Sequence, residues 1–214
     1  MAYLSLVKNL ARLKEEQKYS DEILLDPAGI VITRGTLNEF AGTSGKTGLL
    51  LSLLSQLTQK GEICAVVDAA NSFDPCSAVL AKVELENLLW VKCGGDIEHA
   101  FMAADYLIQA KGFGAVWLNL NGIQKSQLRY VPKTFWYRYR NRIKETPTLM
   151  IVTAAEPVAG SASQDAFVFS RERAVWSGVG KFKLLREFHL SLQSRKKFYG
   201  KPLLTKVEFD YTDV

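Results

Sequence analysis

Leu37-Asn38-Glu39-Phe40-Ala41-Gly42-Thr43-Ser44-Gly45-Lys46-Thr47 is the stretch that decides the fold of this chain. It reads as an apolar strand that runs into a short Gly-rich turn, and an apolar helix follows from Gly48. A strand, a turn ending in Gly-Lys-Thr and a helix form the setting in which backbone N–H groups and a helix N-terminus bind phosphate. The stretch therefore predicts a phosphate-binding loop between the first core strand and its helix.

The spacing inside this loop is shorter than the usual pattern. In G-x-x-x-x-G-K-[ST] the first glycine would fall at position 40, which is Phe40, and the nearest glycine is Gly42. A shorter loop provides fewer N–H donors around a phosphate. ATP and Mg²⁺ are thus possible cofactors, with Lys46 expected on the terminal phosphates and the Thr47 hydroxyl on Mg²⁺. The candidate nucleotide-binding residues are Gly42, Thr43, Ser44, Gly45, Lys46 and Thr47.

Length and composition describe an ordinary globular chain. Its 214 residues, 48% hydrophobic and 23% charged, are sufficient for one substantial core. No apolar run approaches the roughly 18 residues of a membrane span, and the N-terminus lacks the signal-peptide pattern, so we expect a cytoplasmic protein. Three cysteines without a C-x-x-C motif and two histidines make a disulfide framework or a metal site improbable.

Charge is unevenly distributed along the chain. The formal net charge is +5, but residues 129–206 hold 16 Lys/Arg against 5 Asp/Glu, and the other residues hold 11 against 17. Such asymmetry predicts a polyanion as partner of the basic segment, with nucleic acid as the leading candidate. A solvated basic face without a partner is the alternative.

Apolar runs alternate with helical patterns after the loop. Continuous apolar runs are typical of parallel strands covered on both faces, and their alternation with helices indicates right-handed βαβ units. Strands are expected at 62–68, 87–92, 115–119 and 148–153, and helices at 48–59, 75–82, 96–108 and 132–144. After these come short alternating runs at 166–176, 184–193 and 203–209, which predict an antiparallel extension of the sheet.

The N-terminal part precedes this pattern. Residues 3–16 predict an amphipathic helix, which could pack on the protein's own sheet or mediate self-association. Residues 18–36 read as a polar connection with turn signals. We therefore expect an N-terminal helix and connection over 1–34 and a single domain over 35–214.

Four motifs in order carry a family resemblance. They are Gly35-Thr36-Leu37-Asn38-Glu39-Phe40-Ala41-Gly42, Ser44-Gly45-Lys46-Thr47, Cys64-Ala65-Val66-Val67-Asp68-Ala69 with Phe73-Asp74-Pro75, and Leu88-Leu89-Trp90-Val91. Over about residues 35–122 the chain resembles RecA-type recombinases, and it looks closest to ImuA-like proteins, RecA relatives linked to damage-induced (SOS) mutagenesis. The resemblance implies an α/β fold with a RecA-like P-loop NTPase core: a mostly parallel β-sheet flanked by helices, with antiparallel strands at the C-terminal side.

The same resemblance reveals departures from the family's catalytic pattern. The family's water-activating glutamate falls on Ala70, its Mg²⁺-holding aspartate on Asn119, and its γ-phosphate-sensing glutamine on Ala154 or Ala155. Phosphoryl transfer depends on positioning and charge stabilisation, so the loss of these groups together predicts a degenerate ATPase without catalytic residues. An acidic strand-end residue such as Asp68 is more often a turn hydrogen-bonder than a replacement carboxylate.

In the RecA family the segments after the fourth and fifth core strands line the DNA channel, and here these are residues 122–131 and 157–165. The second segment is expected to be flexible from its composition. On the helix between them, Phe135, Trp136 and Tyr139 favour a core position, whereas its basic residues either contact phosphate or are solvated. The DNA-binding candidates are Lys125, Arg129, Lys133, Arg138, Arg140, Arg142, Lys144, Arg195, Lys196 and Lys197. Arg195 could alternatively reach a neighbouring subunit's nucleotide, as a basic pair does in RecA filaments.

Three functions remain open from the sequence. The leading hypothesis is a non-hydrolysing RecA-like accessory factor in the DNA damage response and SOS mutagenesis (translesion synthesis). It would bind DNA, most simply single-stranded, and a recombinase or error-prone polymerase partner. The alternatives are an active DNA-dependent ATPase of the RecA type and a protein-binding inhibitor resembling the SulA type of cell-division inhibitor.

Overall fold

The computed structural model describes residues 22–25, 28–144, 146–179, 181, 183–195 and 202–208. The helix predicted over 3–16, with its proposed role in self-association, lies outside the described residues. Two of the DNA-binding candidates, Lys196 and Lys197, lie outside them as well. Within the described residues, no helix is long and apolar enough to span a membrane.

A mixed sheet of eight strands forms the centre of the fold, in the order β10-β9-β8-β3-β7-β6-β4-β5. The strands are β3 (Leu37–Gly42), β4 (Cys64–Asp68), β5 (Leu88–Lys92), β6 (Ala115–Asn119), β7 (Leu149–Ala154), β8 (Asp165–Ser177), β9 (Leu184–Ser194) and β10 (Leu203–Glu208). In the part of this order that reads β8-β3-β7-β6-β4-β5, each strand runs parallel to the next. The expected α/β architecture is therefore confirmed, and each predicted core strand is present.

The C-terminal strands include the predicted antiparallel extension. β9 pairs antiparallel with β8, and β10 pairs antiparallel with β9. β8 itself runs parallel to β3, through pairs from Asn38–Asp165 to Gly42–Phe169. The segment that follows β7 crosses back over the sheet before β8 begins, so the antiparallel part starts one strand later than the pattern suggested.

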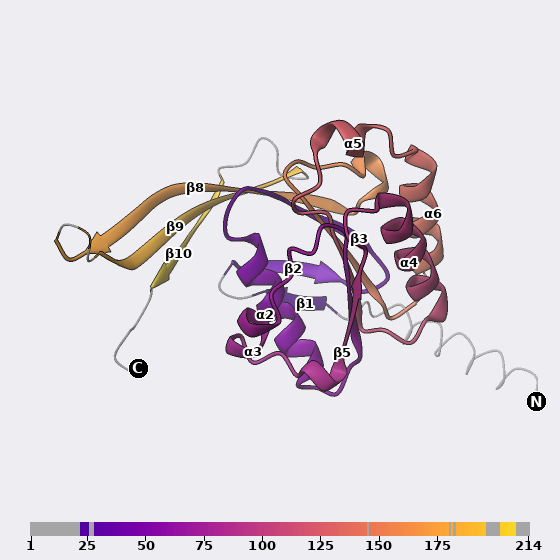
Figure 1. The fold of residues 1–214 in the computed structure, drawn as a ribbon, viewed down its shortest axis with the longest axis horizontal. Coiled ribbons are helices and arrows are strands. Elements are labelled where there is room, and N and C mark those ends of the chain that lie inside the picture. Colours follow the sequence, from indigo (N-terminus) through magenta and orange to yellow (C-terminus); the bar gives the residue numbers. More distant parts are fainter. Residues whose placement is uncertain are drawn as a thin grey trace, which may run out of the picture.

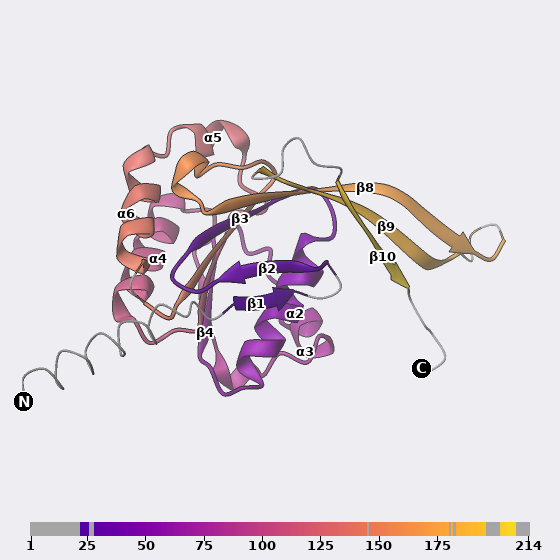
Figure 2. The same cartoon turned by 180° about the vertical axis from the view of Figure 1, so that it is seen from behind.

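Helices cover both faces of the sheet (Figures 1 and 2). The helices are α2 (Lys46–Thr58), α3 (Pro75–Leu80), α4 (Ile97–Ala110), α5 (Lys125–Arg129) and α6 (Lys133–Ile143), with short 3₁₀ turns η1 (Leu85–Asn87) and η2 (Gly160–Ala162). α2 buries its leucines in one hydrophobic cluster with one face of the sheet, and α4 and α6 pack in a second cluster on the other face. This is the layered arrangement that βαβ units produce. The short helix α5 was not predicted.

The connection predicted over 18–36 is wrong for its described part. β1 (Glu22–Leu25) and β2 (Ile30–Thr33) form an antiparallel hairpin. Its alternating side chains Ile23, Leu25, Ile30 and Ile32 are buried in the same cluster as α2. The hairpin therefore acts as an additional cover for this face of the sheet, because it removes the apolar surface of α2 from water.

Local sequence explains where the helices begin. Asp74 accepts hydrogen bonds from the backbone N–H groups of Cys76 and Ser77, which caps α3. Asp96 accepts one from His99 N and caps α4 in the same way. By contrast, the residue before α2 is Gly45, which has no side chain to cap the helix. The first N–H groups of α2 therefore face the carboxyl end of β3 without a capping side chain from this position.

Candidate functional site

The carboxyl ends of β3, β4, β6 and β7 meet at one edge of the sheet, where ligands bind in open α/β folds. Gly42 ends β3 and has a φ of +112°, a conformation that side chains rarely adopt. A Cβ at Gly42 would overlap the carbonyl oxygen of Phe169, and one at Gly45 would overlap the side chain of Leu190. The turn after β3 is therefore enclosed by β8 and β9.

The buried side chain of Lys46 folds back onto this turn. Its side chain is only 7% exposed, and Nζ donates a hydrogen bond to the carbonyl oxygen of Gly42. Burial lowers the pKa of the Lys46 amine below its ordinary value, because desolvation disfavours the charged form. Gly42 N donates to Ala155 O at 3.1 Å, so one loop N–H already has a partner. Thr43 and Thr47 are exposed, whereas Ser44 and Gly45 are half-buried.

A polar network fills the edge where the resembling family places its metal-holding aspartate. The fully buried carboxylate of Asp68 accepts hydrogen bonds from Ser72 N (3.0 Å) and Phe73 N (2.8 Å). Asn119 donates through Nδ2 to Asp68 Oδ1 (3.3 Å) and Ser72 Oγ (2.9 Å), and its Oδ1 accepts from Thr153 Oγ1 (3.0 Å). Each oxygen of Asp68 is therefore already engaged, as expected for a turn hydrogen-bonder.

The residues present do not fit the ATP and Mg²⁺ that the resemblance implies. The Asp68 carboxylate is used by its own turn, the neutral Asn119 is poorly suited to bind a hard cation, and Lys46 occupies the turn. No group of three or more His, Cys, Asp or Glu side chains within the described residues could hold a metal ion. We therefore derive no chemical step through a nucleotide at this edge.

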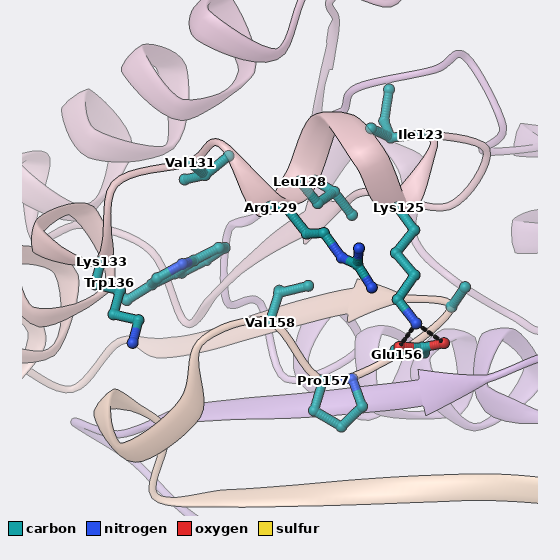
Figure 3. Close-up of a pocket in the computed structure, with 11 residues that line it drawn as sticks. Ile123, Lys125, Leu128, Arg129, Val131, Lys133, Trp136, Glu156, Pro157 and Val158 are labelled. Carbon is teal, nitrogen blue, oxygen red and sulfur yellow. Dashed lines mark hydrogen bonds and ion pairs between the residues drawn. The ribbon is translucent and has the colours of Figure 1, made fainter.

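The same edge carries a groove between α5 and the segment that follows β7 (Figure 3). Its volume is about 330 Å³. Leu128 and Trp136 are buried beneath it. The lining residues are Ile123, Lys125, Leu128, Arg129, Val131, Lys133, Trp136, Ala155, Glu156, Pro157 and Val158. The groove therefore combines an apolar base with polar ends of long side chains.

Three cations line this groove against one carboxylate. Lys125 and Arg129 belong to α5, and Lys133 begins α6. Lys125 forms an ion pair with Glu156, and both side chains are about half exposed, at 52% and 56%. An exposed pair of this kind contributes about 0–1 kcal/mol, so an anion can compete with Glu156 for Lys125. In Figure 3 the guanidinium of Arg129 points toward the same pair. The groove is thus suited to a phosphate-bearing ligand.

Residues 157–165, expected to be flexible, are held in place by side chains from other elements. Glu39 of β3, only 2% exposed, accepts hydrogen bonds from Ala159 N (2.7 Å) and Ser163 Oγ (2.7 Å), and from Val158 N. Arg195 donates to the carbonyl oxygens of Gly160 and Ser163. Composition alone predicted a flexible segment, because these contacts join residues that are far apart in sequence. Arg195 is accordingly engaged with its own chain.

The basic residues of α6 divide into two groups. Arg138 and Arg142 form ion pairs with Asp105 of α4, and Arg138 also lies over the Phe135 ring. Arg140 and Lys144 are exposed. The expected core positions of Trp136 and Tyr139 are confirmed. The structure therefore brings Lys125, Arg129 and Lys133 together in the groove and leaves the other described candidates outside it.

Sequence reasoning missed two carboxylates of this region. Glu39 is a charged residue in a strand that enters the core, a signal that could have identified a buried hydrogen-bond acceptor. Glu156 lies 31 residues after its partner Lys125, so only the fold places them together. Neither residue has a motif of its own.

Comparisons with known proteins agree with this architecture. The RecA protein of Arthrospira platensis is 40% identical over 82 residues, which are 37% of this chain and 22% of that protein. The RecA protein of Borrelia hermsii (strain HS1 / DAH) is 36% identical over 97 residues, 44% of this chain and 27% of that protein. No family model matches. The chain thus spans about a quarter of the length of these curated relatives.

A solved structure matches over most of the chain. The crystal structure of the RadB recombinase superposes with a TM-score of 0.58 at 14% identity, covering 83% of this chain and 88% of that chain. At such low identity the likeness shows the fold alone. Together with the local similarity to RecA proteins, it gives this chain the α/β fold of the RecA-like superfamily.

Proposed function

We propose that this protein is a non-hydrolysing RecA-like accessory factor in the DNA damage response, of the ImuA-like kind that acts in SOS mutagenesis and translesion synthesis. One observation carries the proposal: the network of Asp68, Asn119 and Thr153 occupies the strand ends where ATP chemistry would need free metal-binding groups. The local similarity to RecA proteins supports a role connected with DNA. Function inferred from fold is analogy, so the argument rests on the site.

DNA would bind along the basic groove. Lys125, Arg129 and Lys133 would contact phosphates, which provide affinity without sequence information. Arg140 and Lys144 would extend this contact along the exposed side of α6. The remaining candidates, Arg138, Arg142, Arg195, Lys196 and Lys197, stay proposals of lower rank, since the first three have partners within the chain. The bound factor would recruit a recombinase or polymerase rather than perform chemistry.

Titration with labelled ATP in the presence of Mg²⁺ tests the first half of the proposal. We expect binding no tighter than the millimolar range, with the same weak response for Lys46→Ala. Micromolar binding that Lys46→Ala abolishes would contradict a non-hydrolysing factor. It would favour the alternative of an active DNA-dependent ATPase, for which the uncapped N-terminus of α2 beside Lys46 is the specific supporting feature.

Anisotropy of labelled single-stranded DNA across a salt series tests the second half. We expect Lys125→Gln/Arg129→Gln to weaken binding and to reduce the slope of log K against log salt by about 1.4, or about 0.7 for each lost phosphate contact. A flat and weak response of the unmodified protein would instead favour a protein-binding inhibitor of the SulA type.

A further inference from the structure

The hairpin of β8 and β9 projects from the body of the protein (Figure 1). β3 pairs with β8 only as far as Phe169, whereas β8 continues to Ser177. Paired residues from Arg171–Leu190 to Ser177–Leu184 form this projection, which we call the arm. Seven residues of a strand extend roughly 23 Å. No strand of the described chain pairs with the free edge of β8 along the arm.

Charge on the arm is mostly positive. Residues 171–190 contain five Lys/Arg and two Glu. Arg171, Arg173, Lys181 and Lys183 are exposed, and among the described residues none of these four forms an ion pair. One of the two acids, Glu187, is already paired with His189 (3.0 Å) and Lys206 (3.3 Å). The arm therefore presents uncompensated positive charge to solvent.

The arm also exposes a tryptophan. Trp176 is 55% exposed, whereas Trp117 and Trp136 are 1% and 2% exposed in the core. Trp176 lies opposite Leu185 within the arm. It is three residues from Arg173, so the two side chains project to opposite faces of β8 and a bound strand would contact both across the free edge of β8. Exposed aromatic side chains together with cations are the elements with which proteins bind single strands, since every base offers a face for stacking.

A protein partner that adds a strand to the open edge of β8 is less suited to this arm. The pairing of β8 with β9 shifts register twice, with an extra residue on the edge strand β8 between Arg171 and Arg173 and an extra residue on β9 opposite Val175 and Trp176. Bulges and charged side chains at an edge oppose strand addition. Duplex DNA fits less well too, because its base faces are stacked and closed to Trp176.

We propose that the arm binds single-stranded nucleic acid, with Arg171 and Arg173 contacting phosphates and Trp176 stacking on a base. This goes beyond the proposed function, because the arm lies on β8 and β9 and contributes no residue to the groove between α5 and the segment after β7. A single strand bound by both the groove and the arm would run from the carboxyl ends of the parallel strands to the projecting hairpin.

Anisotropy with labelled dT30 and a duplex of the same length tests the arm in the full chain. Arg171→Gln/Arg173→Gln should weaken dT30 binding about tenfold and reduce the salt slope by about 1.4. The matched control is Lys60→Gln/Lys111→Asn, which removes two exposed cations just beyond the C-terminal ends of α2 and α4 and should leave binding unchanged. Asn suits position 111 because this residue has a φ of +55°.

Variants of Trp176 separate stacking from charge. Trp176→Ala should weaken dT30 binding by about tenfold, whereas Trp176→Phe, which keeps an aromatic face, should stay within about threefold of the unmodified protein. Quenching of tryptophan fluorescence by dT30 should be smaller in Trp176→Phe than in the unmodified protein, and Trp136 beneath the groove accounts for what remains. Because Trp176 is more than half exposed, both variants should fold, which circular dichroism checks.

Three results would overturn the arm as a binding site. They are dT30 affinity of the arm double variant equal to that of the control, fluorescence quenching in Trp176→Phe as large as in the unmodified protein, and duplex binding that is as tight as dT30 binding and is not weakened by Trp176→Ala. Lys125→Gln/Arg129→Gln is measured in parallel. Loss in this groove variant alone contradicts the arm and supports the groove, and loss in the arm variants alone does the reverse.

Discussion

Asn119 and Asp68 lie opposite each other at the ends of neighbouring parallel strands, and Asn119 Nδ2 donates a hydrogen bond of 3.3 Å to Asp68 Oδ1. The same amide donates to Ser72 Oγ, whose residue is part of the turn that Asp68 caps. An aspartate at position 119 could not donate either bond. The asparagine is therefore matched to the carboxylate beside it, and the pair forms a stable polar contact without a metal ion.

The change Asn119→Asp should destabilise the protein at neutral pH. It brings two carboxylates into contact in a buried site and removes two hydrogen bonds, for an expected loss of about 1–3 kcal/mol in the free energy of unfolding. Urea unfolding at pH 7 measures this loss. Mg²⁺ alone should not restore the stability, because the oxygens of Asp68 remain bound to Ser72 N and Phe73 N.

The pH dependence of this variant provides its internal control. Repulsion raises the pKa of a carboxyl in the folded pair above its unfolded value near about 4. The folded state then binds more protons than the unfolded state above that pH, so the deficit relative to the unmodified protein should grow as pH rises. A deficit that is the same at pH 4.5 and pH 7 would show that repulsion is not its cause.

Glu39 provides a second test, since its buried carboxylate holds the segment after β7. In Glu39→Gln the amide oxygen can keep the N–H groups of Val158 and Ala159, but these bonds lose their charged acceptor and an N–H₂ replaces the oxygen that accepts from Ser163 Oγ, which should cost about 1–3 kcal/mol of unfolding free energy. Amide hydrogen exchange in residues 158–163 should accelerate more than in β6. The two measurements together connect the stability loss to this segment.

Glu156→Gln is the matched control for Glu39→Gln. It makes the same chemical change in the segment after β7, but its carboxylate is about half exposed, and among the described residues it pairs only with Lys125. We expect a stability change below about 1 kcal/mol. Equal losses in both variants would mean that Glu39 does not anchor the segment.

Sequence periodicity was sufficient to predict the strands of the central sheet but not the β1–β2 hairpin that packs over α2. The strands β4, β6 and β7 are continuous apolar runs, and such runs with intervening helices permit few topologies. The hairpin of β1 and β2 escaped notice because each strand has only four residues and the turn signals between them suggested a loop. The alternation of buried and exposed side chains in this hairpin becomes interpretable only when α2 is known to cover its apolar face.

The groove shows why the site was predicted only in part. Lys125, Arg129 and Lys133 were identifiable from charge and from their place after the fourth core strand. Charge alone did not separate them from Arg138 and Arg142, which have the same chemistry but pair with Asp105. That distinction depends on how α6 is rotated against α4, and rotation is decided by the packing of Trp136 and Tyr139 rather than by the cations.

The buried amine of Lys46 predicts a pH dependence that a neutral variant should lack. Its pKa is lowered in the folded protein, so between that value and the unfolded value of about 10.4 the unfolded state binds more protons. Stability should therefore rise with pH in this window for the unmodified protein relative to Lys46→Met. Thermal unfolding of both proteins at pH 8 and pH 10 measures the difference.

The test depends on how the stability difference between the unmodified protein and Lys46→Met changes with pH, not on its size at one pH. Lys46→Met also removes the hydrogen bond to Gly42 O, but this loss is the same at both pH values. Groups such as Tyr139, whose pKa is raised by burial, titrate alike in the two proteins and cancel. A stability difference that is the same at pH 8 and pH 10 would show that the amine is solvated, because its pKa would then be the same in the folded and unfolded states.

Gly42 and Gly48 separate two roles of glycine at the start of α2. Gly42→Ala requires a side chain at φ +112° that overlaps Phe169 O, so we expect a loss of more than about 2 kcal/mol or failure to fold. Gly48 lies within α2 with open space around it, so Gly48→Ala should stabilise the protein by about 0.5–1 kcal/mol. Chemical unfolding of both variants tests the enclosed turn: if Gly42→Ala is tolerated as well as Gly48→Ala, then β8 does not cover the loop and the turn has room to open around an anion.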